Sequence, residues 1–354
     1  MKREFPVIDA DGHVIEDVKQ LREFLPGAFQ KEDGKREYVL FPRDGWMRGA
    51  LTPRQREHPD AERWVKFLDH CGISTTVLYT SAGLSIGLIH DADWAVIMAR
   101  AYNDWLHHYF LRVNARFKGV ALLAIQEPQE AANELERCVR DLGMVGGMLA
   151  AVMNPMRGYG LPQFDPIFAA AERLNVPLGV HAGSAAELGL DHFTSFAGVY
   201  PLSHPFAQMQ QLTSMMIHGV FERFPKLRVV FLESGCGWVP YLMDRLEESF
   251  EHRTNRWPHK PTRSPKAIMR GGNLYYSCEV GESTLSSVAS LMGSTQLIWP
   301  SDFPHEKPWD QFSGDLDKFI GREDLSEATT RQILSENPRR LYGLNESEIC
   351  IGAA

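Results

Sequence analysis

The sequence predicts an α/β fold: a parallel (β/α)8 TIM barrel with an inserted loop after the first strand and helices at the C-terminal end. Two observations support this. Short apolar runs alternate with helical segments eight times along the chain, the order of a parallel barrel. The runs show little polar alternation, which is typical of parallel strands buried on both faces. A doubly wound open sheet is the alternative, but no glycine-rich phosphate loop follows any run.

Each strand is predicted from a short run rich in Val, Ile, Leu and Tyr. In chain order the expected strands are Val7–Asp11, Thr75–Thr80, Gly119–Ile125, Gly146–Val152, Pro177–His181, Arg228–Glu233, Leu274–Glu279 and Leu297–Ser301.

Helical segments fill the intervals between these strands. The expected helices are Glu62–Cys71, Asp93–Arg116, Glu130–Leu142, Pro166–Leu174, Phe206–Phe224, Val239–Arg256 and Ser283–Met292, with Asp324–Leu334 after the last strand. The second of these shows the reason most clearly. Its aromatic, methionine and isoleucine side chains recur at helical spacing, which indicates a face packed into the core.

The chain is expected to form one domain over residues 1–345, because an α/β barrel often uses this much chain in a single domain. Residues 25–60 interrupt the pattern. They combine Pro, Gly, Arg and Glu with little periodicity, which predicts an inserted, lid-like segment beside a pocket or, equally, a surface loop without such a role. Residues 346–354 are expected to form a tail.

Composition narrows the classes of function. The 354 residues are 44% hydrophobic and 23% charged, as in a globular protein. A net charge of −8 without Lys or Arg runs argues against nucleic-acid binding. Five cysteines form no CxxC pair, so a cytoplasmic protein without a cysteine-based zinc site is expected. No stretch is apolar enough to span a membrane. The expected partner is a small-molecule substrate, and a homo-oligomer is left open.

Polar side chains of metal-binding type stand at the ends of several expected strands. Asp11 and His13 end the first strand, and alternation along a strand points both the same way. His181 ends the fifth strand, Glu233 the sixth and Asp302 the eighth. Each residue alone reads as a cap or turn residue. In a barrel, however, catalytic groups gather at the C-terminal ends of the strands, so we expect these five side chains at one site.

Six motifs, in this order, resemble one known superfamily. They are Ile8-Asp-Ala-Asp-Gly-His13, Asn103-Asp-Trp-Leu106, Phe164-Asp-Pro-Ile-Phe168, Val180-His-Ala-Gly183, Gly219-Val-Phe-Glu-Arg-Phe-Pro-Lys-Leu227 and Ser301-Asp-Phe-Pro-His305. With them the chain resembles the amidohydrolase superfamily over most of its length. More narrowly, it is similar to the branch that contains aminocarboxymuconate-semialdehyde decarboxylase and the resorcylate-type decarboxylases.

The resemblance implies metal ligands at Asp11, His13, His181 and Asp302. These would hold one divalent ion, with zinc expected first and manganese or iron as alternatives, since carboxylates and imidazoles accept all three. Two departures from the family pattern matter. The first pair is Asp-x-His where the family has His-x-His or Glu-x-His, and Glu233 stands where a histidine commonly handles the metal-bound water. The fourth strand has no lysine to bridge a second metal.

Three side chains are expected to act on the substrate: Glu233, His305 and His204. Glu233 is a candidate general base, with metal ligation or capping of a turn as alternatives. His305 follows Asp302 by three residues, and His204 lies where the fifth loop meets its helix. Glu16, three residues after His13, is expected to support the site without binding the metal.

Four functions remain open at this point. The leading hypothesis is a metal-dependent hydrolase acting on a small organic substrate through activated water. A non-oxidative decarboxylase of a small aromatic or unsaturated carboxylic acid is the second. An iron oxygenase with one or two irons is the third, and a barrel that has lost catalysis is the fourth. The fold does not decide among them, because barrels support many chemistries.

Overall fold

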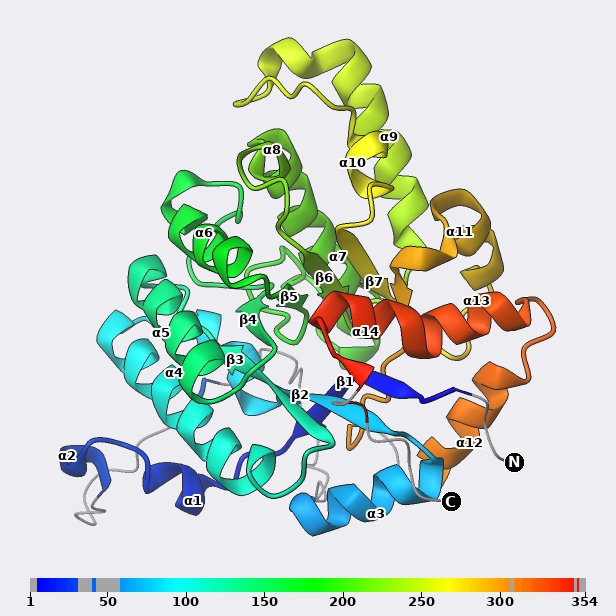
Figure 1. The fold of residues 1–354 in the computed structure, drawn as a ribbon. Helices are drawn as coiled ribbons and strands as arrows, with labels where there is room; N and C mark the ends of the chain where they lie inside the picture. The colour runs from blue at the N-terminus through cyan, green and yellow to red at the C-terminus, as the bar shows by residue number, and fades with distance from the viewer. Residues whose placement is uncertain (1–4, 31–39, 43–57, 306–308, 347–348, 350–354) are drawn as a thin grey trace.

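Eight parallel strands form the inner wall of the molecule in the computed structural model, which describes residues 5–30, 40–42, 58–305, 309–346 and 349 (Figure 1). The strands follow one another around the sheet in chain order. They are β1 (Ile8–Val14), β2 (Thr75–Thr80), β3 (Phe117–Leu122), β4 (Gly146–Ala150), β5 (Leu178–His181), β6 (Val229–Leu232), β7 (Leu274–Ser277) and β8 (Leu297–Ile298). Hydrogen bonds from Ala10 N to Trp299 O (3.1 Å) and from Asp302 N to Asp11 O (3.0 Å) bring the two ends of the sheet together. The predicted TIM barrel is confirmed.

Helices surround this wall on the outside (Figure 1). They are α1 (Val18–Arg22), α2 (Gly27–Gln30), α3 (Ala61–Cys71), α4 (Ala92–Leu106), α5 (Pro128–Asp141), α6 (Asp165–Leu174), α7 (Phe196–Ile217), α8 (Val220–Arg223), α9 (Trp238–Arg253), α10 (Pro265–Met269), α11 (Leu285–Met292), α12 (Trp309–Ile320), α13 (Glu327–Arg331) and α14 (Asn337–Tyr342). Short 3₁₀ turns are η1 (Ala82–Leu88), η3 (Pro162–Phe164), η4 (Thr254–Arg256) and η5 (Ser294–Gln296), and π-helical turns are η2 (His107–Leu111) and η6 (Gln332–Glu336). Asp60, Asp91 and Ser326 cap α3, α4 and α13 by accepting a backbone N–H three residues on.

Burial explains why the strands read as continuous apolar runs. Every strand residue is buried except Lys118, which is half-buried. One face of each strand fills the barrel interior and the other packs under the helices, so neither face can be polar. The charged and histidine side chains of the described strands lie mainly on β1 and β5: Asp9, Asp11, His13 and His181, all of them buried.

A bulge in β1 sets the direction of its acidic side chains. Asp9 pairs with Thr76, but the next paired residue is Gly12, opposite Leu78, so β1 contains one extra residue there. Asp9 turns away from the barrel mouth and accepts hydrogen bonds from the hydroxyls of Thr76 (2.6 Å) and Ser301 (2.8 Å). Beyond the bulge, Asp11 and His13 lie at the C-terminal end of β1, while Asp9 ties β1 to β2 and to the segment that follows β8.

Several boundaries differ from the sequence prediction. The helix expected at Phe206–Phe224 begins ten residues earlier, because α7 accommodates Pro201 and Pro205, which normally end a helix. The strand expected at Leu297–Ser301 stops at Ile298, two residues before Pro300, which has no N–H to pair. The helix expected at 93–116 is α4 with a π-helical turn after it, and the one expected at 324–334 begins after the Ser326 cap.

The predicted insertion lies only partly within the described residues. Leu40 is buried, and Pro42 O accepts a hydrogen bond from Ser85 Oγ (2.7 Å), so this part of the segment rests on η1 beside the end of β2. Residues 31–39 and 43–57 lie outside the described part of the chain, as does most of the expected tail. Within the residues described, no helix combines the length and apolar character needed to cross a membrane.

Candidate metal centre

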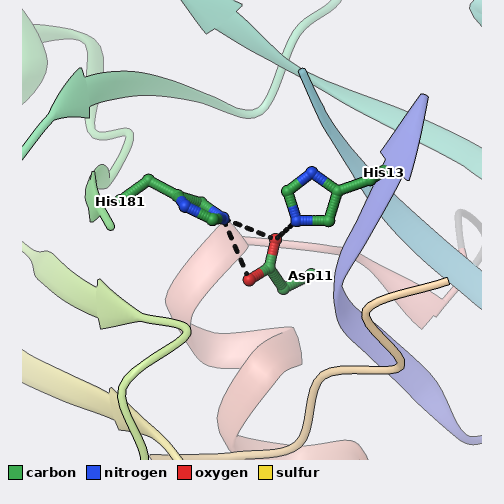
Figure 2. A group of neighbouring side chains, drawn as sticks. All are labelled: Asp11, His13 and His181. Carbon is green, nitrogen blue, oxygen red and sulfur yellow. Dashed lines mark hydrogen bonds and ion pairs between the residues drawn. The ribbon is translucent and has the colours of Figure 1, made fainter. Parts of the chain in front are cut away.

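Asp11, His13 and His181 meet at the C-terminal ends of β1 and β5 (Figure 2). The Asp11 carboxylate lies between the two imidazoles: Oδ1 is 3.4 Å from His13 Nε2, and Oδ2 is 3.2 Å from His181 Nε2. The two rings stand nearly perpendicular, with centroids 5.0 Å apart. All three side chains are buried. This trio has the donor types and the spacing of a metal-binding group.

Backbone carbonyls fix the orientation of both imidazoles. His13 Nδ1 lies 2.8 Å from Thr80 O, and His181 Nδ1 lies 2.6 Å from Ala182 O. A carbonyl oxygen only accepts, so each Nδ1 must carry the proton. Nε2 is then the nitrogen that each ring turns toward Asp11, which is how metal-binding histidines are usually held.

Two atoms of this trio lack ordinary partners. Among the described residues, His13 Nε2 and Asp11 Oδ2 are fully buried without a hydrogen bond. Buried polar atoms normally have a hydrogen-bond partner, so two neighbouring atoms without one require another explanation. A cation bound between them would supply it. The residues present therefore fit a divalent metal ion.

Burial and the neighbouring charges shift the pKa values of all three groups. Burial, together with nearby His305 and His181, lowers the pKa of His13 well below its usual value, so its ring is neutral. Burial raises the pKa of Asp11 to about 7. Burial also opposes charge on His181, but the Asp11 carboxylate outweighs it and raises the pKa of His181 to about 9. A metal ion would displace that proton from His181.

The fourth predicted ligand lies on the other side of His13. Asp302 Oδ1 is 3.6 Å from His13 Nε2 and 2.8 Å from His305 Nδ1. Asp302 has a left-handed backbone (φ +55°), and its N–H donates to Asp11 O. His13, Asp302 and His305 form a second group with metal-binding spacing, which shares His13 with the first. The structure thus groups Asp11, His13 and His181, and places Asp302 against His13 in a second, adjoining group.

Glu233 lies at the mouth, one residue beyond β6. It also has a left-handed backbone (φ +58°), and its N–H donates to Ser277 Oγ (2.9 Å). Its Oε2 is 3.5 Å from His181 Nδ1, and its Oε1 is 3.8 Å from His305 Nδ1. Burial alone would raise the pKa of Glu233, but His305, His204 and His181 lower it far below the usual range. Glu233 is therefore a carboxylate facing histidines.

Capping of the Ser234-Gly235 turn is the alternative role considered for Glu233, and a different carboxylate binds the backbone that follows this turn. The Glu282 carboxylate accepts the N–H groups of Cys236 (2.9 Å) and Gly237, at the start of α9. The Glu233 carboxylate faces His181 and His305 instead.

His305 lies against His13, one of the three residues of the Asp11, His13 and His181 group. Its ring stacks on His13 with centroids 4.1 Å apart, and Ser81 Oγ lies 2.7 Å from its Nε2. Burial opposes charge on His305, but the carboxylates of Asp302 and Glu233 raise its pKa to about 10. These carboxylates therefore favour the protonated form of His305. His204, on α7, is close enough to lower the pKa of Glu233.

The residues that orient the histidines were not expected from the sequence. Thr80 uses a backbone carbonyl, which leaves no signal in the residue type. Ser81 directly follows β2, so the rule that functional groups follow barrel strands could have identified it.

Comparisons with known proteins agree with this geometry. A protein family described as amidohydrolase matches residues 8–344. A gamma-resorcylate decarboxylase from Polaromonas sp. strain JS666 is 27% identical over 297 residues, covering 80% of this chain and 87% of the relative. A 2-amino-3-carboxymuconate-6-semialdehyde decarboxylase from Dictyostelium discoideum is 25% identical over 255 residues, covering 72% and 68%.

A solved structure shares the fold. The dihydroxybenzoic acid decarboxylase of Polaromonas sp. JS666, crystallised with manganese and the inhibitor 2-nitroresorcinol, aligns with a TM-score of 0.72 at 23% identity, covering 98% of this chain and 99% of that one. The resemblance expected from the sequence motifs is confirmed.

Proposed function

The chain belongs to the amidohydrolase family of metal-dependent enzymes, and on that premise we propose that it is a non-oxidative decarboxylase of a small aromatic carboxylic acid. The observation that carries the proposal is the position of His305, a buried imidazole held beside the candidate ligands between Asp302 (2.8 Å) and Ser81 (2.7 Å). Decarboxylation requires a proton for the carbon that loses its carboxylate. The decarboxylases that this chain resembles support the reaction class. The hydrolase favoured by the sequence becomes the second candidate.

Asp11, His13, His181 and Asp302 would hold one divalent ion. We propose manganese in place of the zinc expected first, because carboxylate oxygens suit manganese and a structural relative carries it. When bound, the ion supplies positive charge for the substrate carboxylate and a neighbouring oxygen. Such charge is needed because Asp11, Asp302 and Glu233 would otherwise repel an anionic substrate.

His305 supplies the proton in the proposed reaction. The bond between the ring carbon and the carboxylate breaks, its electron pair forms a C–H bond with the proton from His305, and carbon dioxide leaves. No oxidant or reductant is needed. Glu233 and Asp302 keep His305 protonated before the step, and Glu233 returns a solvent proton to Nδ1 afterwards. Stacking on His13 and the contact with Ser81 hold the ring in place.

The test is an anaerobic assay of the purified protein with hydroxybenzoates, after metal analysis and with manganese or zinc supplied. We expect release of carbon dioxide and, in deuterium oxide, one deuterium on the ring carbon of the product by NMR. The His305→Gln variant should lose about 10²–10⁴-fold in turnover. His218→Gln is the control, because among the described residues that ring is hydrogen-bonded only to Ser214 O (2.9 Å), at the end of α7. Equal activity of the two variants would refute the role of His305.

Water-dependent chemistry is the second candidate, and the ionised Glu233 favours it. A carboxylate near a metal-bound water can take its proton, as a general base in hydrolysis. Solvent labelled with ¹⁸O separates the two reactions: hydrolysis places the label in the product, whereas decarboxylation places only solvent hydrogen there. The comparisons give no support to an oxygenase, and turnover without air would exclude one.

A further inference from the structure

The turn that follows β2 orients two histidines of the site at once. Thr80 O holds His13 Nδ1 at 2.8 Å, and Ser81 Oγ lies 2.7 Å from His305 Nε2. The first contact sets the nitrogen that faces Asp11, and the second sets the proposed proton donor. Any shift of this turn would therefore move a candidate ligand and the candidate acid together.

A single buried carboxylate holds that turn. Glu16 Oε1 accepts from the Thr80 hydroxyl and from the N–H groups of Ser81 (3.1 Å) and Gly83 (3.3 Å). Its Oε2 accepts from Ala82 N (2.9 Å). Glu16 is 6% exposed, so water does not replace these bonds easily. Hydrogen bonds to a charged acceptor are stronger than neutral ones, and four converge here.

The turn is shaped to fit this carboxylate. A Cβ on Gly83 would lie 2.3 Å from Thr80 Oγ1 and 2.8 Å from a methyl of Leu122, so the position needs glycine. Without a side chain there, the Gly83 N–H can reach both Glu16 and the Thr80 hydroxyl (2.8 Å). Among the described residues, no hydrogen bond joins Glu16 directly to the four candidate ligands, so it acts on them only through the turn.

We propose that Glu16 is a positioning residue: through the 80–83 turn it fixes the His13 nitrogen that binds the metal and the orientation of His305. This inference rests on the proposed metal-dependent function. A merely structural carboxylate would stabilise the fold without changing the metal environment, and that difference is measurable.

The experiment compares Glu16→Gln with Glu222→Gln. Glu222 is a matched control, since its carboxylate likewise accepts a hydroxyl and backbone N–H groups, two from Thr262 and Arg263 against three at Glu16, but on the outside of the barrel. Both proteins are loaded with Co²⁺, whose visible absorption reports ligand geometry. We expect the Glu16→Gln spectrum to change and a chelator to remove cobalt about 10–100-fold faster than from the wild type. Glu222→Gln should lower the melting temperature without either effect.

Further arms separate the outcomes. Ser81→Ala should keep the cobalt spectrum and lower only turnover, because it touches His305 alone. Glu16→Asp keeps the charge and should restore slow cobalt release in part, and it replaces Glu16→Gln if that variant does not fold. A wild-type spectrum and release rate in both Glu16 variants would overturn the role of Glu16. Failure of the wild-type protein to bind cobalt would instead overturn the metal centre and the proposed function with it.

Discussion

The two sides of the barrel mouth orient their histidines by different means. On the β1–β8 side, His13 and His305 are held by Thr80 and Ser81, which lie on a turn from another strand. On the β5 side, His181 is held by the carbonyl of the next residue, Ala182. One side depends on contacts between segments far apart in sequence, and the other on local backbone geometry. Substitutions outside the site should therefore disturb the first side more than the second.

The strongest test removes the residue that joins the two sides. Asp11 lies between His13 and His181, so Asp11→Asn should release the metal and reduce turnover to background. This loss should exceed the roughly 100-fold effect of removing a residue that only orients a ligand. Metal analysis after gel filtration measures the loss. Full metal occupancy in this variant would mean that the two sides do not share an ion through Asp11.

The second test concerns Glu233, which contacts His181 on one side and His305 on the other. Glu233→Gln keeps the shape and removes the charge, so turnover should fall by about 10²–10⁴-fold with the metal retained. Ser277→Ala is the control, because it removes only the bond to the Glu233 backbone. Loss of metal would instead show that Glu233 is a ligand.

A smaller effect is expected at Ser81. Ser81→Ala removes the hydroxyl partner of His305 Nε2 and should lower turnover about tenfold, the loss of one hydrogen bond of roughly 1.4 kcal/mol. Substrate affinity and metal content should stay the same. Steady-state kinetics with metal analysis would show this, and a normal rate would mean that stacking on His13 is enough to hold His305.

The smallest effect on activity is expected far from both sides. Burial alone would raise the pKa of Glu222, but hydrogen bonds from Thr262, His259 and Arg263 lower it to about 2. A lowered pKa adds stability above about pH 4.5, and this is lost as the pH falls toward 2. Glu222→Gln should therefore unfold about 2 kcal/mol more easily at neutral pH, with the difference shrinking in acid. Denaturant titrations at pH 7 and pH 3 measure it, and turnover should not change.

Sequence patterns predicted the barrel and the gathering of polar groups at its mouth, because both follow from chain-wide rules. Buried parallel strands leave apolar runs, and strand ends meet at one rim. The bulge in β1 and the left-handed backbones of Glu233 and Asp302 left no such signal, since each depends on neighbouring segments. The start of α7 was misplaced because Pro205 normally ends a helix.

The reaction class could not be predicted with the same success. Hydrolysis was favoured because the sequence places Glu233, a natural base for water, near the metal ligands. The charge state of His305 arises only when Asp302 and Glu233 are brought beside it in three dimensions. That arrangement, together with the similarity to known decarboxylases, favours decarboxylation over hydrolysis.

The contact between the C-terminal helix and the first strand has a consequence for the time at which the enzyme becomes active. Tyr342, at the end of α14, donates its hydroxyl to Ala10 O (2.8 Å), one residue before Asp11 and 332 positions away in the sequence. At synthesis rates of 5–20 residues per second, Tyr342 is translated roughly 20 seconds to a minute after Asp11. We therefore expect metal loading to be a late event in the maturation of the nascent chain, and ribosome-bound fragments that lack α14 should bind metal poorly.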